Sequence, residues 1–407
     1  MFLDTPSRRV SEKLKAWKLC PHCLGRMFGR EGTGYTNPQR AELIAAEMGN
    51  NFVLPENCEL CHGIFGRIEH YAQIAVELLD TVEWNTFLVG SRFDEEILAK
   101  EEKIVLETGA TKAESIKLEF NREVGKKISE LTGKDAEFSE PDCVIILDTR
   151  FDTATLEVRP LFLFGRYRKF SREIPQTRWL CKVCRGKGCK RCNGKGKMYE
   201  TSVQELIAAK VMEATNGKEH FFHGMGREDI DVRMLGNGRP FVLEIREPVK
   251  RTLCLEKLEK EINEFAKGFV EVEGLKLVSG KLVEKIKEEK ATKRYQAVVE
   301  FESKIELDKL EMAVKELREK DIYQKTPNRV LHRRSDLTRK RRIHDIKLCW
   351  LRENTAQLEI ECDAGTYVKE FVSGDQGRTT PSVAELTGVP CRVHTLDVIW
   401  INDKLEE

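Results

Sequence analysis

The sequence predicts an α+β protein with two or three domains. Stretches with strand-like alternation and stretches with helical spacing follow one another without the regular strand–helix–strand order of a parallel sheet. The length of 407 residues exceeds the usual size of one domain, and 40% hydrophobic residues are sufficient for more than one buried core. We divide the chain into residues 1–66, 67–170 and 171–407.

Composition and the N-terminal residues argue against a membrane protein. The chain begins with MFLDTPSRRVSEKLKAW, which is polar and charged and lacks the apolar core of a signal peptide. No apolar run approaches the roughly 18 residues that span a bilayer. We therefore expect a cytoplasmic protein that has no membrane partner and acts as a monomer.

The first segment, residues 1–66, is predicted to bind zinc. Its two CxxC pairs are Cys20 with Cys23 and Cys58 with Cys61, on either side of a helix expected over NPQRAELIAAEM. Two such pairs supply the four thiolates of a tetrahedral structural zinc site, and a reducing compartment disfavours disulfides. His62 is an alternative ligand, but its neighbour Cys61 makes simultaneous ligation awkward. The alternative is that the four cysteines are unrelated and merely buried.

Residues 67–170 are predicted to be helices followed by strands. Apolar residues recur at helical spacing from Ile116 to Leu131. The stretch CVIILDTRFDTATLEVRPLFLFGRYRKF, residues 143–170, alternates as two strands joined by a polar turn.

The third segment opens with a second cysteine cluster. CKVCRGKG and CKRCNGKG, residues 181–188 and 189–196, are tandem copies of CxxCxGxG. One zinc held by Cys181, Cys184, Cys189 and Cys192 is a possible second site, although only four residues separate the two pairs. The alternative is a glycine-rich basic loop that lies on RNA.

The remaining elements of 171–407 are predicted from capping and periodicity. Ser202 and Glu205 form a capping box before the helix VQELIAAKVMEA, and residues 253–265 form a second helix. Strands are expected over RPFVLEI, over residues 293–303, over TAQLEIECD before a turn and a helix, and over CRVHTLDVIWI at the end.

GMGREDIDVRMLGNGRPF, residues 224–241, concentrates acids on a glycine-flanked segment. A catalytic carboxylate must be ionised and held rigidly, and a neighbouring cation favours its ionised form. On an extended backbone Arg227, Asp229 and Asp231 share one face. The alternative is a turn with solvated salt bridges.

Two tyrosine motifs and one basic segment follow. KRY places Tyr295 after two cations, and GTYVKEF offers Tyr367 and Lys369 between a strand and a helix; either tyrosine alone could be a core aromatic. The basic segment, residues 328–346, holds six Arg and one Lys against two Asp. We expect some of these cations to contact RNA phosphates, rather than form a solvated helix face: Arg333, Arg334, Arg339, Lys340, Arg341 and Arg342.

Together, GREDIDVRMLGNGRPF, KRYQAVVE, TPNRVLHRRSD and AGTYVKEFVSGD resemble the archaeal and eukaryotic tRNA pseudouridine synthases of the tenth Pus family, which modify uridines 54 and 55. The resemblance covers essentially the whole chain, including both cysteine clusters. It implies a zinc-binding, THUMP-like RNA-binding accessory region that ends near residue 170. A pseudouridine synthase catalytic domain with a mixed, mainly antiparallel sheet would follow.

The same resemblance implies a reaction and a role for each motif. The N1–C1′ bond of a flipped uridine in the tRNA T-arm would break, and the base would rotate and rejoin through C5, without a cofactor. Asp229 would be the nucleophile, acting on C6, on C1′ or on the 2′ proton. Lys369 and Arg227 would keep it ionised, Tyr367 would pack against the base or ribose, and Tyr295 would stack on the base and help to remove the C5 proton.

Several alternatives stay open at this point. Asp231 is the second candidate nucleophile, and the cations before Tyr295 are expected to favour ionisation of its phenol. A non-catalytic zinc-ribbon RNA-binding protein would explain the cysteines but not the Asp and Tyr motifs. A THUMP-bearing methyltransferase or sulfur transferase would need a glycine-rich nucleotide loop, and the sequence has no G-x-G-x-x-G or G-x-x-x-x-G-K-[ST] in such a context.

Overall fold

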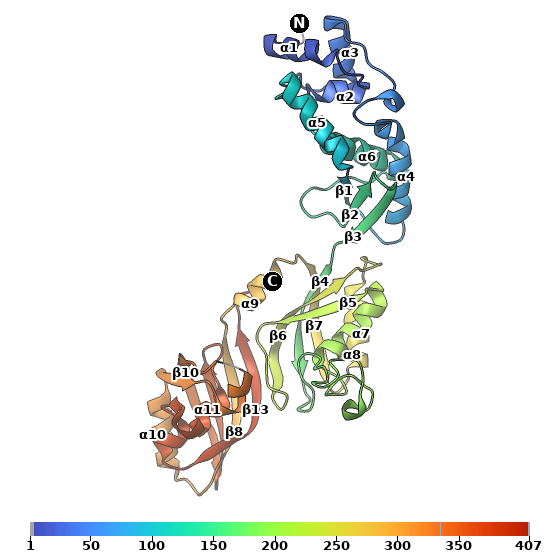
Figure 1. Cartoon of the computed structure of the whole chain (residues 1–407). Helices are drawn as coiled ribbons and strands as arrows, with labels where there is room; N and C mark the ends of the chain where they lie inside the picture. Colours follow the sequence, from blue (N-terminus) through green and yellow to red (C-terminus); the bar gives the residue numbers. More distant parts are fainter. Residues whose placement is uncertain (1–3, 334, 406–407) are drawn as a thin grey trace. The chain divides into compact units, whose positions relative to one another are not determined.

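The computed structural model describes residues 4–333 and 335–405, and these form two compact units (Figure 1). Unit 1 consists of the chain up to Arg159 together with Glu247–Thr252. Unit 2 consists of Pro160–Arg246 and the chain from Leu253 onward. Within the described residues, no helix is long and apolar enough to cross a membrane.

Unit 1 combines helices with a small sheet. Its α-helices are α1 (Thr5–Leu14), α2 (Pro21–Arg26), α3 (Asn37–Met48), α4 (Ile68–Leu79), α5 (Glu95–Thr108) and α6 (Ile116–Thr132). Its strands are β1 (Phe87–Arg92), β2 (Cys143–Asp148) and β3 (Thr153–Val158), and β2 pairs parallel to β1 and antiparallel to β3. The helices predicted at 37–48 and 116–131 are confirmed, whereas β1 was not anticipated.

The core of unit 1 explains why these helices form. Ser115 caps the start of α6 with its side chain, and Gly133 ends the helix at φ 70°. Between these ends Phe120 is fully buried and meets Tyr71 and Phe93 edge to face, at ring-centroid distances of 5.1 and 5.3 Å. The helical spacing in the sequence therefore marks the face that packs against α4 and the sheet.

Unit 2 is built on one ten-stranded sheet. Its order is β12-β9-β10-β11-β8-β13-β6-β4-β7, with β5 paired to β6. The strands are β4 (Leu161–Lys169), β5 (Glu219–Gly224), β6 (Arg233–Arg246), β7 (Val270–Val278), β8 (Thr292–Phe301), β9 (Lys320–Lys325), β10 (Thr338–Arg352), β11 (Thr355–Cys362), β12 (Thr379–Thr380) and β13 (Cys391–Asn402). β13 and β6 pair parallel and the other pairs are antiparallel, so the sheet is mixed and mainly antiparallel, as predicted.

The α-helices that cover this sheet in the described part of unit 2 are α7 (Val203–Thr215), α8 (Leu255–Phe265), α9 (Leu282–Glu288), α10 (Leu307–Leu317), α11 (Val368–Ser373) and α12 (Val383–Thr387). α7 and α8 pack with β7, whereas α10 packs with β10 and α11 with β13 (Figure 1). The Ser202 hydroxyl accepts the backbone N–H of Glu205 at 3.2 Å, which confirms the predicted helix start.

Residues 143–170 differ from the prediction of two strands. The structure has three, because a two-residue break after Val158 separates β3 from β4. β4 belongs to the sheet of unit 2, where it pairs with β6 and β7. Alternation cannot reveal this division, because β2 and β4 show the same inward–outward pattern in different sheets.

The two halves of the unit 2 sheet meet where β13 runs parallel to β6. The register there pairs Asp397 with Arg233. The Asp397 carboxylate forms ion pairs of 2.6 Å with both Arg172 and Arg233. This junction brings the β5–β6 loop, β8 and the start of α11 to one place.

Candidate functional site

The acid-bearing motif forms the loop between β5 and β6. Gly226 opens it at φ +75°, where a Cβ would lie 3.2 Å from Arg239 Nη1 and 3.3 Å from Lys293 Nζ. A side chain would be strained by the backbone and crowded by two cations. The loop ends in a turn in which the Val232 N–H donates to the Asp229 carbonyl at 3.1 Å. Glycine is therefore required where the chain turns toward the cavity.

Glu228 points inward and anchors the loop to the sheet. Its carboxylate forms an ion pair of 3.0 Å with Arg239 of β6, and both side chains are buried. The Tyr167 hydroxyl lies 2.9 Å from each Glu228 oxygen and also accepts from Gln176 Nε2 at 2.9 Å. Gln176 donates to the Gly226 carbonyl at 3.0 Å as well. A buried charged network thus fixes the residue that precedes Asp229.

Lys169 holds the backbone on the other side of this anchor. Its ammonium donates to the carbonyls of Ile230 at 2.8 Å, Ile174 at 3.1 Å and Asp229 at 3.4 Å. Burial lowers the pKa of Lys169 to about 8. The Lys169 ammonium therefore positions the backbone of the loop rather than the Asp229 carboxylate.

The Asp229 carboxylate contacts two cations. Arg329, in the short 3₁₀ segment η4 (Asn328–Arg333), lies 3.0 Å from it, and Lys369 of α11 lies 3.8 Å away. Arg329 is itself positioned by a 2.6 Å hydrogen bond from its Nε to the buried Glu370. Burial opposes the charge of Arg329, but Glu370 and Asp229 outweigh it and raise its pKa. Arg329 thus links the loop to α11.

Lys369 contacts Asp231 more closely than Asp229. Its Nζ lies 2.6 and 2.8 Å from the two Asp231 oxygens. Burial alone would raise the pKa of Asp231, but the hydrogen bond and charge of Lys369 outweigh it and hold that pKa below its usual value. The planar guanidinium next to Asp229 is therefore Arg329, which sequence reasoning missed, and the ammonium of Lys369 is shared by two carboxylates.

These groups open into a cavity of about 880 Å³. Asp229, Asp231, Arg227, Tyr295, Tyr367 and Lys369, all singled out in the sequence, line it. Its volume falls within the range typical of small-molecule sites, roughly 300–1,000 Å³. The fold thus brings together Asp231 and Lys369, which are 138 residues apart in the sequence.

Tyr295 lies on β8, paired with Ile360 on one side and Val398 on the other. Burial raises the pKa of its phenol, and Cys362 adds to this effect while Arg239 opposes it. The expectation that the preceding cations favour ionisation is therefore wrong. The alternation of the strand turns Arg294 away to Glu361, at 3.2 Å, and burial lowers the pKa of Lys293 to about 8.

Tyr367 and Arg227 are placed by their own contacts. The backbone of Tyr367, at the start of α11, exchanges two hydrogen bonds of 3.0 Å with the Gln324 side chain. The Arg227 guanidinium lies over the Trp179 ring, 4.9 Å from its centroid. Trp179 also lines the cavity, so Arg227 forms part of its wall.

The basic segment is a strand and a 3₁₀ turn, not a helix. Arg339, Lys340, Arg341 and Arg342 lie on β10, whereas Arg334 and the side chain of Arg333 lie outside the described residues. Lys340 and Arg342 share Asp321, at 2.8 and 3.5 Å. Alternate residues face opposite sides of a strand, so Arg339 and Arg341 face the other side. Arg341 lies there against Gly365, which lines the cavity.

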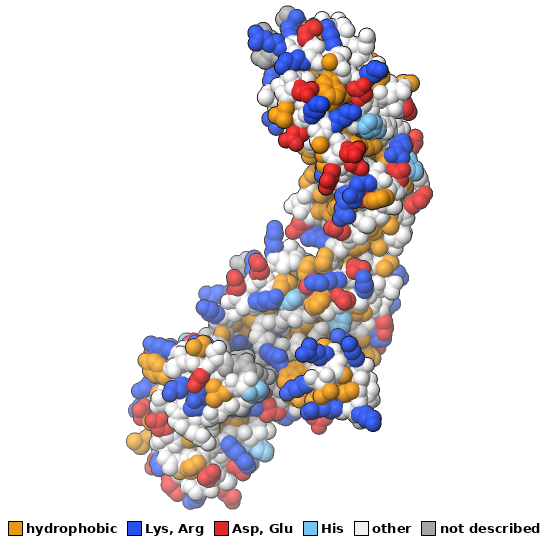
Figure 2. Space-filling model, viewed as in Figure 1, with side chains coloured by type: hydrophobic (Ala, Val, Ile, Leu, Met, Phe, Trp, Pro, Cys, Tyr) orange, Lys and Arg blue, Asp and Glu red, His pale blue; other side chains and the backbone are white. Residues whose placement is uncertain are grey.

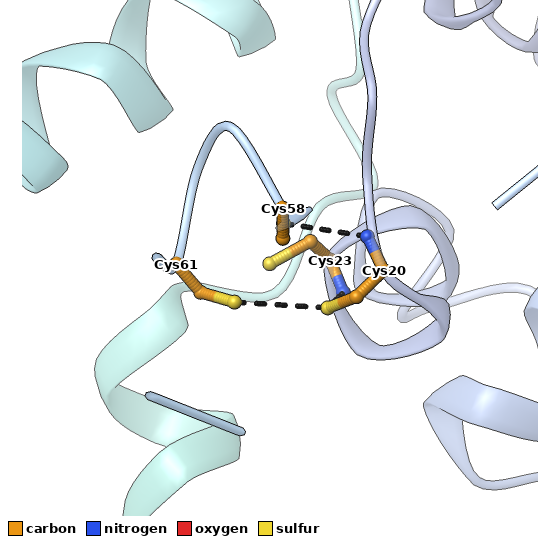
Figure 3. Close-up of side chains that lie close together, drawn as sticks. All are labelled: Cys20, Cys23, Cys58 and Cys61. Carbon is orange, nitrogen blue, oxygen red and sulfur yellow. Dashed lines mark hydrogen bonds between the residues drawn. The ribbon is translucent and has the colours of Figure 1, made fainter. Parts of the chain in front are cut away.

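The first cysteine cluster has the geometry of a four-thiolate metal site. The sulfur atoms of Cys20, Cys23, Cys58 and Cys61 all lie within 4.8 Å of one another, and all four residues are buried (Figure 3). Cys20 and Cys61 are 3.7 Å apart, close to the edge of about 3.8 Å expected for a tetrahedron with metal–sulfur distances of 2.3 Å. This separation is far too long for a disulfide. His62 is exposed and is not part of the cluster.

The tandem CxxCxGxG repeat forms a second four-sulfur cluster. Cys181 lies 3.9 Å from Cys189 and Cys184 lies 3.8 Å from Cys192, and all four sulfurs lie within 4.8 Å. A Cβ on Gly188 would meet the Gly194 carbonyl at 2.7 Å, and one on Gly196 would meet the Gly186 carbonyl at 2.4 Å. Both copies can therefore close on one ion, and the short spacing is no obstacle because the glycine turns pack against each other.

The cavity thus combines an aspartate, adjacent cations and aromatic side chains. Sequence reasoning found the aspartate and tyrosines but missed Glu228, Arg239 and Arg329, which hold the loop. Glu228 lies within the acidic motif itself, yet nothing in the pattern shows which of three acids points inward. Arg329 lies within the basic segment, where its position facing Asp229 depends on the fold.

Replacement of Glu228 by Ala should destabilise the protein strongly. It leaves Arg239 buried without its counter-ion, and breaking such a pair costs about 3–5 kcal/mol. The control is Glu273→Ala, which removes a partly exposed 2.6 Å ion pair with Arg168 and should cost at most about 1 kcal/mol. Thermal unfolding of both variants measures the difference; equal losses would contradict a special role for Glu228.

Comparison with known proteins shows which family this chain resembles. The family model "Pus10, C-terminal" matches residues 162–402, and "Pus10 THUMP domain, archaeal" matches residues 71–148. A curated "tRNA pseudouridine synthase Pus10" from Methanothrix thermoacetophila is 41% identical, covering 95% of this chain and 92% of the relative.

Two further relatives with this name extend the match to nearly the full length. The Methanopyrus kandleri protein is 41% identical, covering 97% of this chain and 98% of the relative. The Pyrococcus furiosus protein is 39% identical, covering 98% of each. Family models and relatives agree along both units, and the chain therefore belongs to the archaeal Pus10 family of THUMP-containing tRNA pseudouridine synthases, which are isomerases.

Proposed function

We propose that this protein converts uridine 54, uridine 55 or both to pseudouridine in the T-arm of tRNA, with Asp229 as nucleophile and no cofactor. The observation that carries the proposal is the Asp229 carboxylate at the cavity wall, 3.0 Å from Arg329, in the cavity that Tyr295 also lines. An extruded uridine needs both a stacking surface and a reactive group at its glycosidic bond. This cavity offers both.

Asp229 is favoured over Asp231 by its surroundings. The Asp231 side chain is 63% exposed and carries the closest contacts of Lys369, whereas Asp229 is 39% exposed. The buried anchor at Glu228 and the Lys169 contacts to the loop carbonyls fix Asp229 from beneath. A nucleophile requires this kind of rigid positioning, because small displacements reduce the rate steeply.

The other cavity residues would bind the substrate. Tyr295 would stack on the extruded base, and its neutral phenol oxygen would take the C5 proton while the phenol proton passes to a solvent water in the cavity. Tyr367 would contact the base or ribose. Arg227, held over Trp179, would contact the RNA at the rim, and Lys369 would help to hold the aspartates.

The remainder of the chain would hold the tRNA. We propose that residues 1–66 form a zinc-binding segment, that residues 67–159 form a THUMP-like RNA-binding region, and that the catalytic domain begins at β4 rather than at residue 171, because β4 pairs with β6 and β7. Arg339, Lys340, Arg341 and Arg342 of β10, with Arg333 and Arg334 before them, would contact phosphates of the T-arm. The position of Arg341 against the cavity residue Gly365 supports a role for these cations in RNA binding.

Zinc would be structural in both cysteine clusters and take no part in the reaction. Thiolate donors in a tetrahedral arrangement favour zinc, and four protein ligands leave no open position for a substrate. The buried N-terminal cluster would join α2 to the loop before α4. Thiolate sites of this kind fit the reducing cytoplasm, where we expect the protein to act as a monomer.

One experiment tests the function as a whole. Purified protein is incubated with an unmodified tRNA transcript in the absence of any cofactor, and pseudouridines are mapped by carbodiimide treatment and primer extension. We expect stops that report positions 54, 55 or both. Tight tRNA binding without any pseudouridine would favour a non-catalytic RNA-binding protein.

Replacement of Asp229 by Asn should abolish product formation. The amide keeps the shape of the side chain but is not a nucleophile, so tRNA should bind normally while pseudouridine falls to background. Asp231→Asn is the matched control, and it should retain clear activity because its carboxylate contacts Lys369 rather than the substrate. Single-turnover assays at saturating enzyme compare the two. The reverse result would identify Asp231 as the nucleophile.

Replacement of Tyr295 by Phe should preserve tRNA binding but slow the single-turnover rate by about 10²–10⁴, as for a lost proton-transfer group. Tyr295→Ala should weaken binding in addition, by about 1–3 kcal/mol of stacking. Because burial raises the pKa of the phenol, Tyr295 stays protonated and adds no rising limb to the wild-type rate between about pH 6 and 9.

Tyr323→Phe is the control for this series, since Tyr323 is half exposed on β9. It should behave as the wild type in both assays. A rate for Tyr295→Phe close to the wild-type rate would limit Tyr295 to stacking.

The whole protein should contain two zinc ions per chain. Structural zinc contributes on the order of 10–16 kcal/mol in small zinc domains, so Cys20→Ser should lose one ion and lower the thermal stability of unit 1. Cys143→Ser is the control, because Cys143 is buried in β2 but belongs to neither cluster. Elemental analysis gives the count; a single ion in the wild type would leave one cluster without metal.

A further inference from the structure

The tandem CxxCxGxG repeat, residues 181–197, projects from unit 2 as a separate small element that we call the finger. Its base is closed by a bridge between Leu180 and Lys197, and the Cys181 N–H donates to the Gly196 carbonyl at 2.8 Å. In Figure 1 the finger lies in the green loops below α8, and Lys and Arg side chains gather on the same part of Figure 2.

The finger is organised as two near-equivalent halves. Arg185 and Asn193 occupy the same position in the two copies and have φ values of 50° and 48°. The contact of Gly188 with Gly194 is matched by that of Gly196 with Gly186, which is the relation expected of two copies related by a local twofold. Four sulfurs at the centre therefore give a rigid scaffold whose other side chains point outward.

The outward side chains are almost entirely cationic. Residues 181–197 contain seven Lys or Arg and no Asp or Glu. Lys195 and Lys197 pair with Glu200 and Glu205. Five cations are exposed and, among the described residues, lie beyond ion-pair distance of any carboxylate: Lys182, Arg185, Lys187, Lys190 and Arg191. A divalent metal on four thiolates contributes a formal charge of −2, so the loaded finger keeps +5 of its +7.

The base of the finger joins the wall of the catalytic cavity. The Met198 N–H donates to the Trp179 carbonyl at 2.9 Å, and the Trp179 ring meets Tyr199 edge to face at 5.6 Å. Trp179 lines the cavity and carries Arg227 on its ring. The cationic surface thus begins at the rim of the site that holds Asp229.

We propose that the finger is a metal-clamped arm that binds the phosphate backbone of the substrate RNA beside the target uridine. An RNA that enters the cavity must pass its rim, and a rigid cationic surface without acids matches a polyanion. Cations on a fixed scaffold lose less entropy on binding than cations on a mobile loop. The finger supplies affinity and register, while Asp229 performs the chemistry. This inference rests on the proposed function for the identity of the RNA as tRNA.

The test is a triple variant, Lys182→Gln with Lys187→Gln and Lys190→Gln, in the full chain. Its control removes three exposed lysines on and near α10, which do not line the cavity: Lys304→Gln, Lys309→Gln and Lys315→Gln. Binding of an unmodified tRNA transcript is measured over a series of salt concentrations. Each lost phosphate contact lowers the slope of log K against log salt by roughly 0.7–0.9, so the finger variant should lose about 2 and the control almost nothing.

Kinetics and metal content complete the test. The finger variant should keep its zinc and have a higher KM for tRNA. Its saturated single-turnover rate should stay within about twofold of the wild-type rate, because the lost contacts stabilise the bound substrate and the transition state equally. Cys189→Ser should lose one zinc and weaken tRNA binding, because the cations of the finger then lie on a mobile loop. A metal-loaded finger variant with the wild-type slope overturns the proposal and would favour an acidic protein as partner of this surface.

The outcomes separate the two proposals. In one outcome the wild type forms no pseudouridine, but the finger variant has a lower slope of log K against log salt than the wild type. This outcome contradicts the proposed function and supports RNA binding by the finger. In the other outcome the wild type forms pseudouridine, and the finger variant has the same salt slope and the same KM for tRNA as the wild type. This outcome supports the proposed function and overturns the inference about the finger.

Discussion

The buried ion pair between Glu228 and Arg239 is the interaction on which the site depends. Taking two charges out of water is costly, and the pair is tolerated because Tyr167 and the Met225 carbonyl provide further hydrogen-bonding partners within the network. What this arrangement provides is a single loop geometry. Glu228 is buried against Arg239, while the neighbouring Asp229 contacts Arg329 at the cavity.

Charges at the surface of the loop are arranged differently from those beneath it. Arg329 contacts Asp229, Lys369 is shared between Asp229 and Asp231, and Glu370 holds Arg329 in place. The contacts of Lys369 with the two aspartates are partly exposed, so each is weak, whereas Arg329 is held by the buried Glu370. Asp229 therefore lies between a buried network that fixes the loop and a group of cations at the cavity.

The two cysteine clusters share a geometry but differ in setting. The N-terminal cluster is buried within the core of unit 1, where its metal would replace part of a hydrophobic core. Among the described residues, the finger has almost no hydrophobic core of its own. Its centre consists of the four sulfurs and closely packed glycine backbone. A metal there would offset the mutual repulsion of the surrounding cations, because the finger lacks acids to do so.

Local patterns in the sequence were sufficient to find the motifs that carry the chemistry, about half of the helices and strands, and the α+β class. Periodicity and capping are local, and the cysteine spacing is a local signal as well. Family resemblance added the catalytic sheet. Three features became visible only in the folded chain: Glu228 is the acid that points inward, Arg329 lies closer to Asp229 than Lys369 does, and burial raises the pKa of Tyr295. Those features depend on side chains far apart in the chain, whose meeting is set by strand register and packing and leaves no periodic trace in the sequence.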